Sequence, residues 1–574
     1  MSNGADLLCG TLEALGVELV FGIPGTQNVL LYEAIQKSGI RSVLATSELA
    51  AAFMANGYFR ASGRVGPVVT IPGPGFTYAL TGVAEASQDS VALLHIVGKP
   101  ESREGKRYGF QAIDQAAIAG PLVKGVVTIE RAEEISWKTA QAHGLAVSGE
   151  PGPVLLQWSK DALNTDLEEP ADPSPDLVDY GFPPADSLIE EAAVFIGSAR
   201  KPILLLGQGA AASSARLLKL AERLGSPVFT TISGRGILPE DHELVLGFDL
   251  VRSEVQVLNE MIRESDCVLA FGSRLSSAGT GGYLLELPKE RLIRVEGDET
   301  VLQANYPPRI GILGSTEAVL GRLIPMLDKY ARPDGGWTGE EIGEYRKRLR
   351  SVPRKAVPEP TVHGVTPPDA GSLMAALRRA LPRNGIVVTD SGLHQTLVRR
   401  HFDVLSPRGL IVPNDFQSMG FGIPAAIGAK LGAPDRPVVA VIGDGCFAMT
   451  GMELLTAVRE KIPLTVVVFN DGRLNLIRLQ QIASSGRTES VDIVNPDFAA
   501  FAAAVGAQYA FVEGNAEQVF RKAMESDRVT LVEVGVGDSG TIRRMRVKGY
   551  LRDTARRALG PTLTKKIKSW RKGK

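Results

Sequence analysis

Short apolar runs alternate with amphipathic segments over most of the chain, and this alternation predicts parallel sheets covered by helices. Amphipathic patterns at 47–63 and 315–330 predict two of the helices. The runs expected to form strands are 19–25, 43–46, 66–73 and 91–98, then 202–210, 227–233, 266–274 and 291–298, and finally 385–392, 409–415, 437–445, 463–471 and 529–536.

Two proline-rich stretches divide the 574-residue chain into three blocks. They lie at 168–186 and 351–368, and their prolines disfavour both helices and sheet ladders. The expected domains are residues 1–180, 186–332 and 369–540, with a linker at 333–368. Because each block repeats the strand–helix alternation, the predicted fold class is α/β, with three doubly wound parallel-sheet domains.

Residues 541–574 form a basic tail with 13 lysines or arginines and one acidic residue, Asp553. The whole chain has a formal charge of −1, so residues 1–540 carry −13. This overall balance excludes a globally basic nucleic-acid binder. The tail is expected to be solvated or to fold against an acidic face. The alternative is that it contacts an anionic surface or substrate.

Composition and cysteine spacing narrow the class of protein further. The chain is 44% apolar and 22% charged, which suits several buried cores rather than disorder. It has no run of 18 or more apolar residues, so we expect no membrane span. Cys9, Cys267 and Cys446 lie far apart and give neither a disulfide framework nor a metal-ligand spacing. The first residues lack the pattern of a signal peptide, and we therefore expect a cytoplasmic protein.

Two carboxylates follow neighbouring strands of the third block. Asp444 lies at the end of the run 437–445, and Asp471 ends the run 463–471. The carboxyl ends of parallel strands share one edge, where such folds bind ligands. Gly445 allows close approach of an anion, and two carboxylates with phosphate oxygens suit Mg²⁺ or Ca²⁺. Taken alone, the same Asp-Gly pairs could equally be ordinary turns.

Gly443-Asp444-Gly445, followed after 24 residues by Asn470-Asp471, resembles the signature of thiamine diphosphate-dependent enzymes. The resemblance implies a Mg²⁺ ion held by the side chains of Asp444 and Asp471 and by the carbonyl of Arg473. Many relatives have asparagine in place of Asp471, so this site carries one more negative charge. The resemblance also implies further cofactor-binding residues: Gly443, Gly445, Cys446, Leu474, the backbone of Leu393 and the side chain of His394.

The same family resemblance extends to the cofactor's pyrimidine end. Residues 415–435 resemble the segment that holds the aminopyrimidine, with the Gln417 carbonyl accepting from the 4′-amino group and Met419 wedged between the two rings. Thiamine chemistry requires a carboxyl group bonded to the pyrimidine N1′. Glu48, at a strand-to-helix junction, resembles that catalytic glutamate. Loops resembling those that line the mouth of the site contain Pro24, Gly25 and Gly73.

Residues 109–124 and 470–481 resemble the acetolactate synthase group of the family. Phe110, Gln111 and Lys124 correspond to positions near the substrate channel, with Gln111 as a candidate catalytic residue, although Gln111 and Lys124 could also be ordinary surface polar residues. The implied reaction is decarboxylation of a pyruvate-like 2-oxo acid, with ligation to a second carbonyl acceptor. In relatives, the glutamate-bearing domain of one subunit faces the diphosphate domain of another. The implied active unit is therefore a homodimer at least, or a homotetramer.

Several alternatives remain open at this stage. The same family contains non-ligating 2-oxo acid decarboxylases, acyltransferases and catalytically silent relatives. Residues 207–212 match a loose dinucleotide-binding pattern, which would suit an oxidoreductase, but no acidic residue ends the next predicted strand. Relatives use the central domain for FAD, for ADP or for nothing. The segment 246–253 replaces the FAD-associated run of those relatives, which favours no flavin here.

Overall fold

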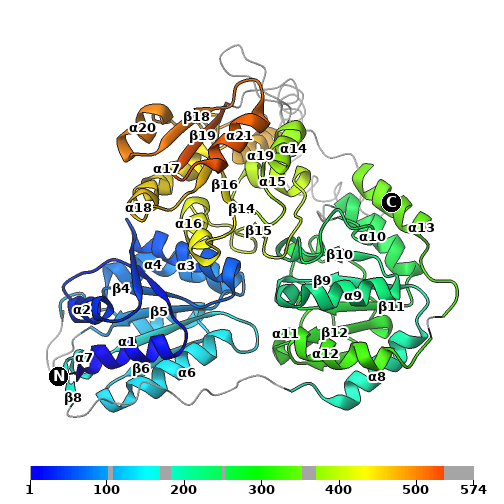
Figure 1. Ribbon diagram of the computed structural model, residues 1–574, viewed down its shortest axis with the longest axis horizontal. Coiled ribbons are helices and arrows are strands. Elements are labelled where there is room, and N and C mark those ends of the chain that lie inside the picture. Colours follow the sequence, from blue (N-terminus) through cyan, green and yellow to red (C-terminus); the bar gives the residue numbers. More distant parts are fainter. Residues whose placement is uncertain are drawn as a thin grey trace, which may run out of the picture.

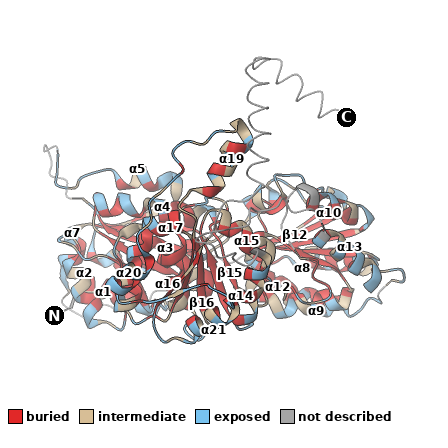
Figure 2. Ribbon diagram, turned by 90° about the horizontal axis from the view of Figure 1, so that it is seen from above, coloured by how far each residue is buried: buried red, intermediate tan, exposed pale blue. Residues whose placement is uncertain are grey.

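The computed structural model describes residues 2–100, 108–167, 183–247, 252–331, 333–351 and 370–535, and these form three parallel-sheet units (Figure 1). The N-terminal and C-terminal units lie against each other, and the central unit lies beside them. In Figure 2 the strands are red, the colour of buried residues, and the helices around them are pale blue on their outer faces. The sheets are therefore the buried layers. The three-domain α/β class predicted from the sequence is confirmed.

The N-terminal sheet is parallel, with the order β3-β2-β4-β5-β7-β6. Its strands are β2 (Leu19–Gly22), β3 (Arg41–Leu44), β4 (Gly66–Thr70), β5 (Leu93–Gly98), β6 (Gly125–Ile129) and β7 (Pro153–Trp158). The helices are α1 (Gly4–Ala14), α2 (Val29–Lys37), α3 (Glu48–Ser62), α4 (Pro74–Gln88), α5 (Gln115–Ala119), α6 (Ile135–Val147) and α7 (Lys160–Asn164). The short strands β1 (Ser2–Asn3) and β8 (Asp166–Leu167) pair antiparallel beside it.

The C-terminal sheet is also parallel, with the order β15-β14-β16-β17-β19-β18. Its strands are β14 (Ile386–Thr389), β15 (Leu410–Ile411), β16 (Val438–Gly443), β17 (Thr465–Asn470), β18 (Gln508–Phe511) and β19 (Thr530–Gly535). The helices are α14 (Ala370–Ala380), α15 (Leu393–His401), α16 (Gly422–Gly432), α17 (Asp444–Thr450), α18 (Leu454–Arg459), α19 (Asn475–Ser485), α20 (Phe498–Val505) and α21 (Ala516–Glu525). Numbered within its own domain, this sheet has the same strand order as the N-terminal one.

The central sheet has the order β10-β9-β11-β12-β13. Its strands are β9 (Pro202–Leu206), β10 (Val228–Thr230), β11 (Cys267–Phe271), β12 (Leu292–Glu296) and β13 (Ile310–Leu313), and its helices are α8 (Asp186–Ser198), α9 (Ser214–Leu224), α10 (Arg252–Glu264), α11 (Glu299–Gln303), α12 (Thr316–Leu327) and α13 (Gly339–Ser351). Helix α13 lies inside the expected linker 333–368. Its Ile342, Tyr345 and Leu349 are buried in the core of the central domain, which explains why this segment is helical.

Helices α3 and α16 join the two outer domains, and each follows the second strand of its own sheet. They approach so closely that glycine is required at the contact. A Cβ added at Gly57 would overlap the Ala425 carbonyl, and one at Gly428 would overlap the Met54 carbonyl. Both helices are buried along most of their length. The two domains therefore share one hydrophobic core.

Every strand expected from the apolar runs is present, and the helix expected at 47–63 appears as α3. The basic tail 541–574 lies outside the described residues. Within the part of the chain that the structure describes, no helix is both long and apolar enough to cross a membrane.

The α3–α16 contact predicts a difference between two helical glycines. Gly428→Ala inserts a methyl group into backbone and is expected to lower the free energy of unfolding by about 1–3 kcal/mol or more. Gly343→Ala, on the exposed face of α13 with no atom within 4 Å of the added Cβ, is the matched control. It is expected to raise stability by about 0.5–1 kcal/mol, because alanine is the better helix former. Equilibrium denaturant unfolding measures both; equal effects would contradict the close contact.

Candidate functional site

A cavity of about 130 Å³ opens at the carboxyl edge of the C-terminal sheet. It lies where the strand order reverses between β14 and β16, the usual ligand-binding position in such sheets. The structure brings ten of the expected residues to it: Leu393, His394, Met419, Gly443, Asp444, Gly445, Cys446, Asp471, Arg473 and Leu474.

Asp444 is the organising acid of this cavity. It is buried, and its Oδ1 accepts the N–H of Gly445 at 2.8 Å. Its Oδ2 accepts the N–H groups of Asp471 (3.0 Å) and Gly472 (2.6 Å) and the side-chain amide of Asn495 (2.7 Å). One carboxylate thus holds the loops that follow β16 and β17 together. The sequence alone does not predict this role of Asn495, because Asn495 lies 51 residues from Asp444 and belongs to no motif.

Asp471 lies beside Asp444 in a partly buried position. Its Oδ1 accepts the Arg473 N–H at 3.0 Å, and the Arg473 carbonyl accepts the Asn475 N–H at 2.9 Å. Burial and the charge of Asp444 raise the pKa of Asp471 to about 7. Two carboxylates that repel each other in this way create a site that a divalent cation stabilises.

The polar groups around the carboxylate pair fit a hard cation with phosphate oxygens. The side-chain oxygens Oδ1 of Asn475 and of Asn495 are buried and have no hydrogen-bond partner among the described residues. Amide and carboxylate oxygens are the ligand types that Mg²⁺ prefers. Unpaired buried oxygens are costly, so their concentration beside two carboxylates indicates a bound partner.

His394 supplies a further unpartnered atom at the same cavity. Its ring is buried, and no described residue pairs with its Nε2. Burial lowers the pKa of His394 to about 4, so the ring is neutral and carries one N–H donor at pH 7. The ring packs against two strand-end glycines: a Cβ at Gly443 would lie 2.9 Å from Nδ1, and one at Gly392 would lie 2.6 Å from Cε1. These glycines leave room for the imidazole ring against the backbone.

The loop before α16 carries the two residues expected at the pyrimidine. Gln417 adopts a left-handed conformation (φ 65°), and its side-chain oxygen accepts from the Ser391 hydroxyl at 3.3 Å. Met419 is half-buried and points toward Gly445, with its Cε 3.5 Å from a Cβ built there. Asp390, which the sequence analysis did not single out, fixes this loop, since its carboxylate accepts the N–H groups of Gly420 (3.0 Å) and Gly422 (2.7 Å).

Glu48 is the first residue of α3, whose N-cap is the Ser47 hydroxyl. It lies half-buried at the carboxyl edge of the N-terminal sheet, where a Cβ at Gly75 would be 2.8 Å from Glu48 Oε1. Nearby, the buried Tyr32 hydroxyl lacks a described partner. Burial, together with the Glu48 charge, raises the pKa of Tyr32. The glutamate therefore stands in a confined space with an unused hydrogen-bonding group beside it.

The loops around Glu48 contain the other expected residues of the N-terminal domain. Pro24 and Gly25 lie between β2 and α2, and the Gly25 N–H donates to Asn28 Oδ1 at 2.7 Å. Gly73 has φ 68° and caps α4, and a Cβ there would lie 2.9 Å from the Gln111 carbonyl. Gln111 thus lies against this turn, with its buried Oε1 unpartnered among the described residues.

Glu48 and Lys124 lie apart from the C-terminal cavity and from each other. All described residues that line the cavity belong to the C-terminal domain, so Glu48 does not enter the cavity of its own chain. Lys124 lies before β6, at the amino end of the strand, where its ammonium donates to the Ser148 carbonyl at 2.5 Å. The structure therefore does not bring Lys124 to the edge that carries Glu48 and Gln111. Phe110 is 76% exposed.

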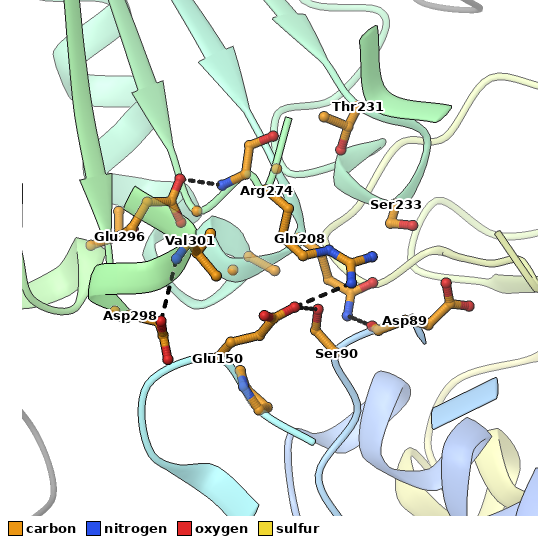
Figure 3. A pocket seen from close by; sticks show the side chains of 18 of the residues that line it. Asp89, Ser90, Glu150, Gln208, Thr231, Ser233, Arg274, Glu296, Asp298 and Val301 are labelled. Atoms are coloured by element: carbon orange, nitrogen blue, oxygen red, sulfur yellow. Dashed lines mark hydrogen bonds and ion pairs between the residues drawn. The ribbon is translucent and has the colours of Figure 1, made fainter. Parts of the chain in front are cut away.

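A second, larger cavity of about 500 Å³ lies where the three domains meet (Figure 3). Arg274, after β11, is one of the residues that line it. Its guanidinium pairs with Glu150 of the N-terminal domain (3.2 Å) and with Asp415 of the C-terminal domain (2.6 Å). Gln208, from the loop after β9, donates to the Asp89 carbonyl at 3.1 Å. The cavity wall therefore links all three domains.

The lining of this cavity fits a dinucleotide poorly. A Cβ at Gly207 would overlap the Gly272 carbonyl, so Gly207 serves the contact between two strand-end loops. Glu296, at the end of β12, already accepts the Ser273 N–H at 2.8 Å. The lining arginines also have protein partners: Arg60 pairs with Asp89, Arg235 with Glu240, Arg274 with Glu150 and Asp415, and Arg408 with the Phe59 carbonyl. A diphosphate would have to displace these contacts.

Three domain descriptions match the chain in order. The N-terminal TPP binding domain of thiamine pyrophosphate enzymes matches residues 2–118, the central domain of these enzymes matches 189–323, and their C-terminal TPP binding domain matches 390–534. Each matched range falls within one of the three parallel-sheet units.

Curated relatives match over nearly the full length. The acetolactate synthase large subunit of Corynebacterium glutamicum is 32% identical over 97% of this chain and 90% of its own length. The corresponding protein of Lactococcus lactis is 32% identical over 94% of this chain and 93% of its own. A probable 2-ketoarginine decarboxylase of Pseudomonas aeruginosa is also 32% identical, over 93% of this chain and 94% of that protein.

The Glu296 carboxyl predicts a pH-dependent stability of the central domain. Burial raises the pKa of Glu296 to about 8, above its unfolded value, so its stabilising contribution is present at low pH and is lost as pH rises. Glu296→Gln keeps an oxygen for the Ser273 N–H and cannot ionise. We expect the variant to gain stability relative to the parent between about pH 5 and about pH 8, as measured by thermal unfolding.

The control is Glu286→Gln, which removes an acid that is 60% exposed and pairs with Arg263. It should leave the pH dependence of the unfolding temperature as it is. Parallel pH curves for Glu296→Gln and the parent protein would show that Glu296 does not titrate in this range.

Proposed function

The chain belongs to the thiamine pyrophosphate enzyme family, and we propose that it decarboxylates a pyruvate-like 2-oxo acid and joins the product to a second carbonyl compound. Acetolactate synthase large subunits match it over more than nine-tenths of its length, which supports carboligation. The cytoplasmic location expected from the sequence stays a prediction.

The paired carboxylates of the C-terminal cavity carry this proposal. Asp444, Asp471 and the Arg473 carbonyl would hold Mg²⁺, and the unpartnered oxygens of Asn475 and Asn495 support such a site. The neutral His394 ring and the first-turn N–H groups of α15, which begins at Leu393, would donate to the diphosphate oxygens. Gly443, Gly445, Cys446 and Leu474 would form the walls around it.

Thiamine diphosphate, when bound, supplies a nucleophilic carbon and an electron sink that allow a 2-oxo acid to lose CO₂. The chain's own residues orient it. Glu48 would hold a proton in a hydrogen bond to the pyrimidine N1′, and the Gln417 carbonyl would accept from the amino group. Met419 would keep the two rings in a bent conformation. Gln111, with its unpartnered Oε1 beside Gly73, would contact the substrate.

A second copy of the chain would complete the site. The cavity is built by the C-terminal domain alone, whereas Glu48 faces the edge of the N-terminal sheet. Large apolar side chains are exposed on both domains, including Tyr78, Phe110, Met449 and Met452. We therefore propose a homodimer in which Glu48 of one copy serves the cavity of the other, with a tetramer as a further association. FAD or ADP in the central cavity stays unfavoured, because Gly207 serves a contact between loops and the lining arginines have protein partners.

The second candidate function is decarboxylation without ligation. A relative named as a probable 2-ketoarginine decarboxylase is as similar as the acetolactate synthases are, which favours keeping this reaction in view. The two reactions differ in product: incubation with pyruvate yields acetolactate or acetoin in the first and acetaldehyde in the second.

Two substitutions test the proposed roles separately. Glu48→Gln is expected to lower turnover by a factor of about 10²–10⁴, because it removes the proton at N1′, while calorimetry still detects binding of thiamine diphosphate with Mg²⁺. Asp444→Ala is expected to abolish that binding, because it removes a metal ligand. Glu33→Gln, on the exposed face of α2, is the control for Glu48→Gln.

Full turnover by Glu48→Gln would reject the role of this glutamate. Retention of cofactor by Asp444→Ala would reject the metal site. Failure of the parent protein to bind thiamine diphosphate in the presence of Mg²⁺ would reject the function as a whole.

A further inference from the structure

A buried acid of the C-terminal domain reaches across to the loop that carries Glu48. Glu453 is only 1% exposed, and it lies at the end of the short 3-10 turn η7 (Gly451–Glu453) that follows α17. The loop it reaches connects β3 to α3 in the N-terminal domain, 407 residues away in the sequence. No motif in the sequence joins these two segments.

Both oxygens of Glu453 are used in this contact. Oε1 accepts the backbone N–H of Thr46 at 3.0 Å and also the Thr46 hydroxyl. Oε2 accepts the hydroxyl of Thr456 at 2.8 Å. A buried carboxylate with several donors is a rigid anchor, because losing it would leave those donors unpaired in the interior.

The next helix of the C-terminal domain, α18, fixes the end of strand β3 as well. The Arg459 guanidinium donates to the Leu44 carbonyl, and the Thr456 hydroxyl, which donates to Glu453, lies 3.3 Å from the same carbonyl. Leu44 is the last residue of β3, and Thr46 stands two residues before Glu48. The backbone that leads into Glu48 is therefore held at two successive points by one segment of the other domain.

On its other side, Glu48 has little freedom to compensate for a shift of this backbone. A Cβ at Gly75 would lie 2.8 Å from Glu48 Oε1 and 2.8 Å from the Ile71 side chain. The carboxylate thus fills a narrow space against the start of α4. If the Thr46 backbone shifted, the Glu48 carboxylate would shift with it. A change of side-chain rotamer would not bring the carboxylate back to the same position.

The contact is not needed to hold the two domains together. Helices α3 and α16 interlock through Gly57 and Gly428, and one hydrophobic core spans both domains. Glu453 lies outside that helix pair. Its removal is therefore expected to act locally, on the β3–α3 loop, rather than to separate the domains.

We propose that Glu453 is a positioning residue that holds the Thr46 backbone and thereby sets the place of Glu48. This inference rests on the proposed function, since it assigns to Glu453 a task in placing the acid that bonds the pyrimidine N1′. Misplacing a reacting group by a fraction of an ångström to one ångström costs on the order of tenfold to a hundredfold in rate.

The test compares Glu453→Ala, Glu453→Gln and Glu460→Ala. The glutamine of Glu453→Gln can still accept from the Thr46 N–H, so this variant should keep the exchange rates of the parent protein. Glu460 belongs to the same interface. It pairs with Arg41, the first residue of β3, at 2.7 Å and with Arg459 at 3.6 Å, but it makes no bond of its own to the Thr46 backbone. The first readout is the rate at which the C2 hydrogen of the bound cofactor exchanges for deuterium. Each variant is loaded with thiamine diphosphate and Mg²⁺ and placed in D₂O, the reaction is quenched at set times, and NMR measures the hydrogen that remains.

The second readout needs no cofactor. Amide hydrogen exchange of residues 43–50, measured by mass spectrometry on the cofactor-free protein, reports how firmly the Thr46 backbone is held. We expect Glu453→Ala to slow C2 exchange on the order of tenfold to a hundredfold and to speed amide exchange in this segment. Glu453→Gln and Glu460→Ala should remain near the parent in both measurements.

The outcomes separate this inference from the proposed function. If Glu48→Gln slows C2 exchange but Glu453→Ala does not, Glu453 has no positioning role and the proposed function stands. If Glu48→Gln itself leaves C2 exchange unchanged, the proposed function fails. Should Glu453→Ala not fold, Glu453→Asp replaces it, since the side chain that is one methylene shorter keeps the charge but draws the carboxylate back from the Thr46 N–H. Severalfold slower C2 exchange in Glu453→Asp supports the role, and exchange at the parent rate overturns it.

Discussion

The close approach of helices α3 and α16 is the contact on which the arrangement of both outer domains depends. Backbone meets backbone at Gly57 and Gly428, so the helices cannot slide or separate without opening a shared core. Because each helix follows the second strand of a sheet with the same strand order, the two domains are joined through equivalent elements. This one contact sets where the carboxyl edge of each sheet lies, and hence where Glu48 and Asp444 stand.

Buried carboxylates do the finer positioning. Asp444 ties together the loops after β16 and β17, and Asp390 holds the loop that carries Met419. Glu453 and Asp89 do the same across the domain boundary, the latter accepting the N–H groups of Asn414 and Asp415 at 3.1 Å. In each case an acidic side chain satisfies backbone donors that a loop cannot pair with itself. Loops that would otherwise be free to move become fixed parts of the site.

Much of the fold could be predicted from the sequence because its core strands are continuous apolar runs, as buried parallel strands are. The strands that went unpredicted include β18, whose residues are mostly exposed at a sheet edge, and β6, which is only partly buried. The sequence predicts a linker where helix α13 lies, because the polar residues of this segment outnumber the buried Ile342, Tyr345 and Leu349. The roles of Asp390, Asn495 and Glu453 depend on partners 30 to 407 residues away. No local sequence pattern predicts contacts of this kind.

Arg274 gives the junction of the three domains a property that the apolar contacts lack. Its guanidinium and the carboxylates of Glu150 and Asp415 are all partly open to solvent, with side-chain exposures of 30%, 29% and 16%. Dissolved electrolyte therefore screens their attraction, whereas it leaves the glycine-mediated helix contact untouched. The link that Arg274 makes between the central domain and the two outer domains is thus weaker at high ionic strength.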